Sequence, residues 1–95
     1  MGNLRRLVLD VLKPAEPSIL QLLQALGDLE DVEGVNISIY EIDRLVENAK
    51  VTLEGNNLSY EQVARVIEEY GGSIHSIDEV AAGKVLIEDV DTPQD

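Results

Sequence analysis

The chain has 95 residues and a net charge of −12, with 19 acidic and 7 basic residues, and a chain of this length is expected to form one domain. The charge disfavours nucleic acid and anionic membrane surfaces as partners, because both would repel the protein. The absence of cysteine excludes disulfides, thiolate metal sites and a cysteine nucleophile, and it fits a cytoplasmic protein.

Residues 4–12 are predicted to form a strand, because apolar side chains recur along it with a period of two. Pro14 stops this strand, since proline cannot donate a hydrogen bond to a neighbouring strand. Pro17 and Ser18 open a predicted helix that runs to about Asp28. Its apolar residues recur at helical spacing and form one stripe: Ile19, Leu22, Leu23 and Leu26.

Residues 32–42 and 48–54 are predicted to form a second and a third strand, joined by a bend at residues 45–47. The second strand is expected to bury one row of alternate residues: Val35, Ile37 and Ile39. The other row faces the opposite side of the sheet: Asn36, Ser38, Tyr40 and Ile42.

The remaining elements are a second helix and a fourth strand. Ser59 and Gln62 predict a capping box at the start of the helix, and the glycine pair after Tyr70 predicts its end. The fourth strand is expected at about residues 73–80. Residues 84–90 could continue it past a bulge.

The order strand, helix, strand, strand, helix, strand predicts a ferredoxin-like βαββαβ sandwich, an α+β fold. Right-handed crossovers then give an antiparallel sheet of order 4-1-3-2 with both helices on one face. Residues 1–90 are assigned to this single domain and residues 91–95 to an acidic C-terminal tail. The opposite face of the sheet is left without a helix to cover it.

In this topology several polar side chains fall in or near one neighbourhood of the uncovered face. The candidate ligand-binding residues are Asp10, Tyr40, Lys50, His75 and Ser76. The candidate metal ligands are Asp10, Glu41, Asp43 and Asp78. Carboxylate oxygens suit hard cations, so Ca²⁺ or Mg²⁺ is the expected ion. The alternative is that Lys50 pairs with Asp10 across neighbouring strands and that the other polar groups are hydrated.

Apolar residues on the same face favour a protein interface. Val8, Leu12 and Ile42 are expected there, whereas a fully hydrated sheet face would be more polar. The apolar segment 84–87 lies beyond the expected end of the fourth strand, where it could pair with the sheet edge of a neighbouring copy. These features predict a homo-oligomer, and a closed ring would leave no sheet edge exposed.

The predicted function is a non-enzymatic binding or regulatory module for a divalent cation or a small polar ligand. One alternative is an enzyme whose interfacial site would use His75, Asp78 and Glu79 with residues of a neighbouring copy, and another is a purely structural assembly. His75 and Ser76 are neighbours in a strand and point to opposite faces, so they cannot pair as base and nucleophile within one chain. No catalytic residue is assigned.

Three stretches and the final TPQD carry a resemblance to a known family: RRLVLDVLKPAEPSI, VEGVNISIYEIDRLVENAKVTLEG and GGSIHSIDEVAAGK. They resemble an uncharacterised archaeal family, domain of unknown function two-hundred-eleven, over nearly the whole chain. The resemblance implies a ferredoxin-like fold, assembly into homo-oligomers and an archaeal cytoplasmic source. It also implies a bound calcium ion, whose ligands it does not identify, and it implies no particular activity.

Overall fold

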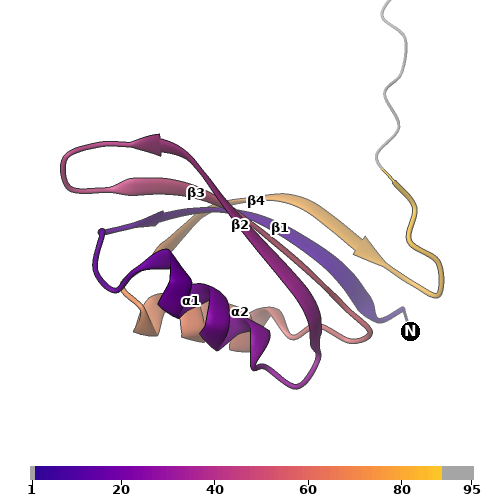
Figure 1. Cartoon of the computed structure of the whole chain (residues 1–95). Helices are drawn as coiled ribbons and strands as arrows, with labels where there is room; N and C mark the ends of the chain where they lie inside the picture. The colour runs from indigo at the N-terminus through magenta and orange to yellow at the C-terminus, as the bar shows by residue number, and fades with distance from the viewer. Residues whose placement is uncertain (1, 89–95) are drawn as a thin grey trace, which may run out of the picture.

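The computed structural model describes residues 2–88, and its elements follow the predicted order (Figure 1). The strands are β1 (Leu4–Lys13), β2 (Val32–Ile42), β3 (Glu47–Gly55) and β4 (Ser73–Ala82), and the helices are α1 (Ile19–Gly27) and α2 (Tyr60–Glu69). The four strands form one antiparallel sheet of order β2-β3-β1-β4, which is the predicted order read from the other edge. The prediction of a ferredoxin-like α+β fold is therefore confirmed.

Both helices pack on one face of the sheet (Figure 1). The aliphatic side chains between the two layers are no more than 1% exposed: Leu7, Leu9, Val11, Leu22, Leu26, Val51, Leu53, Val63 and Ile67. Burying each such side chain stabilises the fold by about 1.5–3 kcal/mol. The other face of the sheet, which we call the open face, carries the second row of β1: Arg6, Val8, Asp10 and Leu12. Among residues 2–88 no helix is long and apolar enough to span a membrane.

Serine caps set where both helices begin. Ser18 Oγ accepts from the backbone N–H of Gln21, and the Gln21 side chain accepts from the backbone N–H of Ser18, so α1 has a complete capping box. At α2 only half of the predicted box forms, because Ser59 accepts from the N–H of Gln62 without the reciprocal bond. Gly71, with a φ of 84°, follows the end of α2 as predicted.

A register shift in β2 changes which side chains reach the open face. The shift falls between Ile39 and Glu41 and makes Tyr40 an extra residue in the strand. Beyond this bulge Ile42 pairs with Glu47, in the row that faces the helices. The prediction of Ile42 on the open face is therefore wrong, because alternation restarts after the extra residue. The bend between β2 and β3 occupies residues 43–46 rather than 45–47.

The fourth strand ends at Ala82, and its predicted continuation through residues 84–88 is wrong. Gly83 has a φ of 108°, a conformation that glycine adopts without strain, and it turns the chain out of the sheet. Residues 84–88, which we call the return segment, lead back to β1, where Glu88 bonds Arg6. The rest of the predicted continuation and the acidic tail, 89–95, lie outside the described residues.

Candidate functional site

A polar cluster on the open face draws on strands β1, β2, β3 and β4, and consists of Asp10, Tyr40, Glu41, Asn48, Ser76 and Asp78. Asp10 of β1 accepts a hydrogen bond from the hydroxyl of Tyr40. Since β3 lies between β1 and β2, the Tyr40 side chain reaches across β3 to make this bond. Ser76 is in register with Asp10 from the other side, and its hydroxyl donates to Asp78 Oδ1 at 2.7 Å. Tyr40 is the extra residue at the register shift in β2, and Asp78 is the extra residue at a register shift between β1 and β4.

Negative charge dominates this polar cluster. The hydrogen bond to Asp10 raises the pKa of Tyr40 to about 12, with smaller contributions from desolvation and from the nearby carboxylates of Asp10, Asp78 and Glu41. Glu41 also accepts a hydrogen bond from Asn48 Nδ2 at 2.5 Å. Three carboxylates close enough to influence one phenol form a region that a cation would neutralise.

Three of the candidate residues stand apart from the hydrogen bonds of the cluster. Lys50 is in register with Asp10, but no ion pair joins the two within the described part of the chain. Asp43 lies in the bend after β2, where its backbone N–H donates to Val46 O at 2.8 Å. His75 is an extra residue in β4 and is exposed, so the structure gives it no Ser76 or Asp78 partner among residues 2–88.

The single chain does not assemble a complete cation site in its described residues. No group of three His, Cys, Asp or Glu side chains within 2–88 converges closely enough to hold a metal ion. Calcium usually takes about six to eight oxygen ligands in proteins. The polar cluster of one chain, as far as residues 2–88 show it, therefore falls short of the ligand set that calcium requires.

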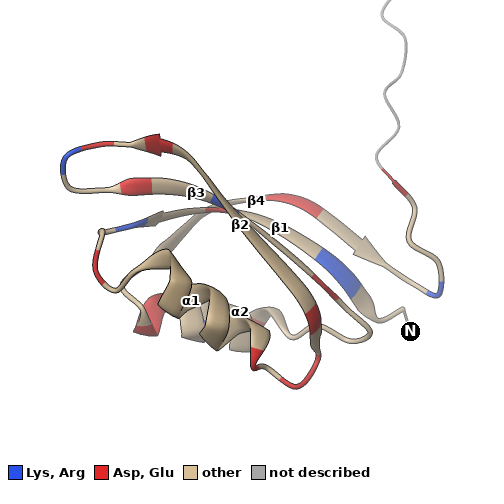
Figure 2. Ribbon diagram, in the orientation of Figure 1, with Lys and Arg blue, Asp and Glu red and all other residues tan. Residues whose placement is uncertain are grey.

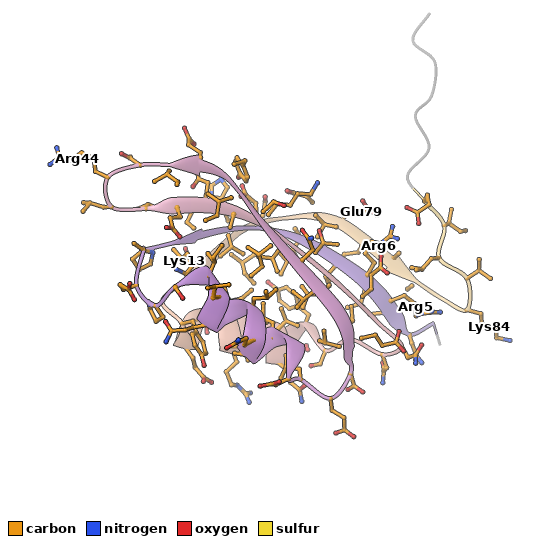
Figure 3. The ribbon with its side chains drawn as sticks, in the orientation of Figure 1. Arg5, Arg6, Lys13, Arg44, Glu79 and Lys84 are labelled. Carbon is orange, nitrogen blue, oxygen red and sulfur yellow. The ribbon has the colours of Figure 1, made fainter. Side chains whose placement is uncertain are left out.

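A second cluster, the Arg6 cluster, was missed by the sequence analysis. The Arg6 side chain is 11% exposed and contacts three carboxylates, Glu54 and Glu88 at 2.8 Å and Glu79 at 3.0 Å. In Figure 2 the blue segment of β1 lies beside the red segment of β4, and Figure 3 shows Arg6 next to Glu79. These hydrogen bonds raise the pKa of Arg6, and the bonds from Arg6 lower the pKa of Glu88. Glu54 was predictable from its register opposite Arg6, whereas Glu88 depends on the turn at Gly83.

Lys13 is a buried charge that the sequence analysis also missed. The residue is 1% exposed, and its Nζ donates to Pro14 O at 2.5 Å and to Pro17 O. Glu47 Oε1 lies 3.8 Å from the same nitrogen and is buried without a hydrogen bond within residues 2–88. The row of alternate buried residues in β1 extends to Lys13, and this pattern in the sequence was the signal that Lys13 is buried. Lys13 ties β1 to the loop before α1 (Figure 3) and is a structural residue.

Comparison with known proteins gives one family and one close relative. A family model described as DUF211, uncharacterized ArCR, matches residues 5–95. The uncharacterized protein MJ0319 of Methanocaldococcus jannaschii is 56% identical over 95 residues, which cover 100% of this chain and 98% of that protein. Neither description names an activity or a ligand.

Proposed function

Since the chain belongs to the DUF211 family, we propose that it is a non-enzymatic binding module that assembles with copies of itself and takes a divalent cation or a small polar ligand on the open face. The observation that carries this proposal is the polar cluster. Asp10, Tyr40 and Asp78 meet on a sheet face that no helix covers within residues 2–88. The hydrogen bonds of this cluster are exposed, so its oxygen atoms are accessible to a ligand.

Assembly is supported by apolar side chains at two opposite ends of the molecule. Leu45, at the tip of the β2–β3 hairpin, is 81% exposed, and Ile87 in the return segment is 76% exposed. In Figure 3 Arg44 marks the hairpin tip and Lys84 marks the far end. Two different surfaces at opposite ends suit a head-to-tail contact, which either closes into a ring or extends into a filament.

The two ends also complement each other chemically. Asp78, Glu79, Val80 and Ile87 line a hollow of about 300 Å³, which combines two aliphatic side chains with two carboxylates, of which Glu79 is paired with Arg6. Arg44 and Leu45 present a cation and an aliphatic side chain in sequence at the hairpin tip. The hairpin tip of one copy therefore matches this hollow in the next copy, which would bring a second chain close to Asp78 of the polar cluster.

The cation is tested by thermal unfolding with Ca²⁺, with Mg²⁺ and with a chelator. A cation that binds the native state must raise the melting temperature. Asp10→Asn is expected to reduce this rise, whereas Asp31→Asn, which removes an exposed carboxylate from a loop, should leave it unchanged. Equal melting temperatures under all three conditions would exclude the cation and leave the structural assembly as the better account.

The assembly is tested by light scattering on the full chain. Leu45→Glu is expected to reduce the molar mass towards that of one chain, because it places a carboxylate against Asp78 and Glu79 of the next copy. The matched control is Leu20→Glu, which changes an exposed leucine on α1. A monomeric wild-type protein, or a mass that Leu45→Glu does not change, would contradict the head-to-tail contact.

A further inference from the structure

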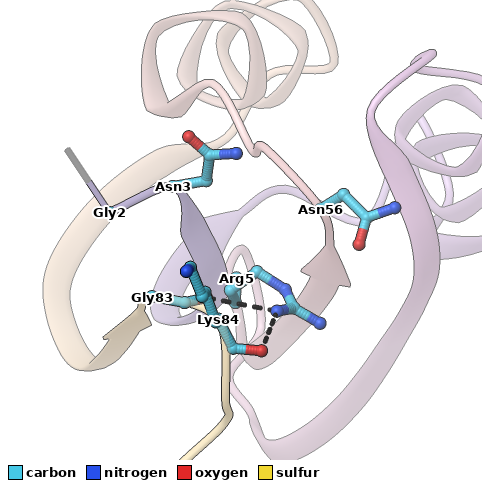
Figure 4. Close-up of a pocket in the computed structure, with 6 residues that line it drawn as sticks. All are labelled: Gly2, Asn3, Arg5, Asn56, Gly83 and Lys84. Atoms are coloured by element: carbon cyan, nitrogen blue, oxygen red, sulfur yellow. Dashed lines mark hydrogen bonds between the residues drawn. The ribbon is translucent and has the colours of Figure 1, made fainter.

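A hollow of about 640 Å³ lies where the ends of β1, β3 and β4 meet (Figure 4). It is lined by Gly2, Asn3, Arg5, Asn56, Gly83 and Lys84. Two basic residues face it and no carboxylate is among its lining residues within 2–88, although the chain has 19 acidic and 7 basic residues. We propose that this hollow, which we call the Arg5 pocket, binds a small free oxyanion, either a carboxylate or a phosphate group.

Within residues 2–88, the Arg5 side chain is held in place by backbone carbonyl groups alone. It is the extra residue at a register shift in β1, so the bulge directs its side chain across the sheet end. Nε donates to Gly55 O at 3.0 Å, and Nη1 donates to Gly83 O and Lys84 O, each at 3.1 Å. The guanidinium group is thus fixed by three neutral acceptors, and no ion pair within the described residues neutralises its charge.

Arg5 differs from the neighbouring Arg6 in how its charge is paired. Arg6 is paired with three carboxylates, whereas no ion pair of Arg5 and no protein acceptor for its Nη2 N–H groups occur among residues 2–88. A guanidinium has five N–H donors, of which three bond Gly55 O, Gly83 O and Lys84 O, so the two N–H groups of Nη2 remain for an oxygen of a carboxylate or phosphate group. The preorganised geometry reduces the entropy lost on binding.

The other lining residues indicate which hydrogen-bonding groups the ligand should carry. Lys84 is exposed and adds a second cation, and Asn3 adds an amide (Figure 4). Asn56 uses one N–H of its Nδ2 to bond Glu33 at 2.9 Å, and its carbonyl oxygen remains as an acceptor beside the hollow. A ligand that carries a hydroxyl beside its oxyanion would match this lining, because the oxyanion accepts from Arg5 and Lys84 and the hydroxyl donates to the carbonyl oxygen of Asn56. Hydrogen phosphate and hydroxy acids are ligands of this kind.

The test is an NMR titration of the full chain with inorganic phosphate, followed at Arg5 Nε and at the side-chain amides of Asn3 and Asn56. Saturable shifts at these groups are expected with phosphate and not with chloride at equal ionic strength. Lys84→Met should weaken binding about tenfold, by analogy with the loss of one charge-assisted hydrogen bond. Arg44→Met is the matched control, since it removes an exposed cation at the other end of the molecule.

The results of this titration distinguish carboxylate binding, phosphate binding and general screening of charge. Acetate that binds as well as phosphate assigns the pocket to carboxylates, and phosphate alone assigns it to phosphate groups. Shifts that chloride reproduces, or an equal weakening by Arg44→Met, would overturn the proposal as general screening of charge. Lys84→Met is preferred to Arg5→Met because Arg5 also joins strand ends, so its removal could unfold this region. Asp10→Asn should leave phosphate binding intact, which keeps this proposal separate from the cation on the open face.

Discussion

Lys13 is a charged side chain on the core side of the sheet, and its environment predicts a large effect on stability. Lys13→Met would remove the donor to Pro14 O and Pro17 O and leave the Glu47 carboxylate without its nearby cation. Breaking a buried pair from one side is expected to lower the free energy of unfolding by about 3 kcal/mol. Urea denaturation measures this loss as a lower midpoint at an unchanged slope.

Lys50 provides the control for that experiment. Lys50→Met makes the same substitution at an exposed strand position, and the change in unfolding free energy should stay within about 0.5 kcal/mol. Adding Glu47→Gln to Lys13→Met should recover part of the loss, because the unpaired carboxylate is then removed as well. Equal effects of the two lysine substitutions would show that the buried contacts of Lys13 contribute little.

The hydrogen bond between Tyr40 and Asp10 makes a prediction about pH. The pKa of Tyr40 is raised to about 12, above the ordinary value of about 10, so the bond stabilises the fold fully below about pH 10 and is lost as the pH rises through about 12. The phenolate absorbance of the wild type minus that of Tyr40→Phe gives this titration directly. Asp10→Asn should move the midpoint of this titration down towards the ordinary value. An unmoved midpoint would show that the hydrogen bond is not the main cause of the raised pKa.

At the scale of elements, the return segment is attached to the sheet through the Arg6 cluster. Both guanidinium Nη atoms of Arg6 donate to Glu88, at 2.9 and 2.8 Å. Arg6→Met is therefore expected to release residues 84–88 and to speed trypsin cleavage after Lys84, as measured by mass spectrometry. Arg44→Met is the control, and equal cleavage rates in the two variants would show that Arg6 does not hold the segment.

The same attachment should weaken in acid. Because the pKa of Glu88 is lowered in the fold, the contact stabilises the protein above the ordinary carboxyl pKa and is lost as the pH falls through the lowered value. This element is thus held by charge, whereas α1 and α2 are held by apolar burial and serine caps. An element held by a few exposed ionic contacts opens more readily than one packed on the core.

At the scale of the whole molecule, the net charge of −12 opposes a compact fold. Raising NaCl from about 10 mM to about 1 M shortens the screening length from about 30 Å to about 3 Å, so the melting temperature is expected to rise. Glu68→Gln with Glu69→Gln should raise it at low salt and reduce its salt dependence, since both carboxylates lie at the end of α2, where its dipole is negative. A melting temperature that falls with salt would show that ion pairs such as those of Arg6 outweigh the repulsion.

Element order and apolar periodicity were enough to predict the ferredoxin-like fold and to place Asp10, Tyr40 and Ser76 near one another. Both signals are local, because a period of two or of 3.6 residues is written along the chain itself. The bulge at Tyr40, the contact between Arg6 and Glu88, and the fixed position of Arg5 were decided only in three dimensions. Each of these features depends on how the strands align or on where the chain turns. Alignment and turns are set by contacts between residues far apart in sequence, which a local pattern does not predict.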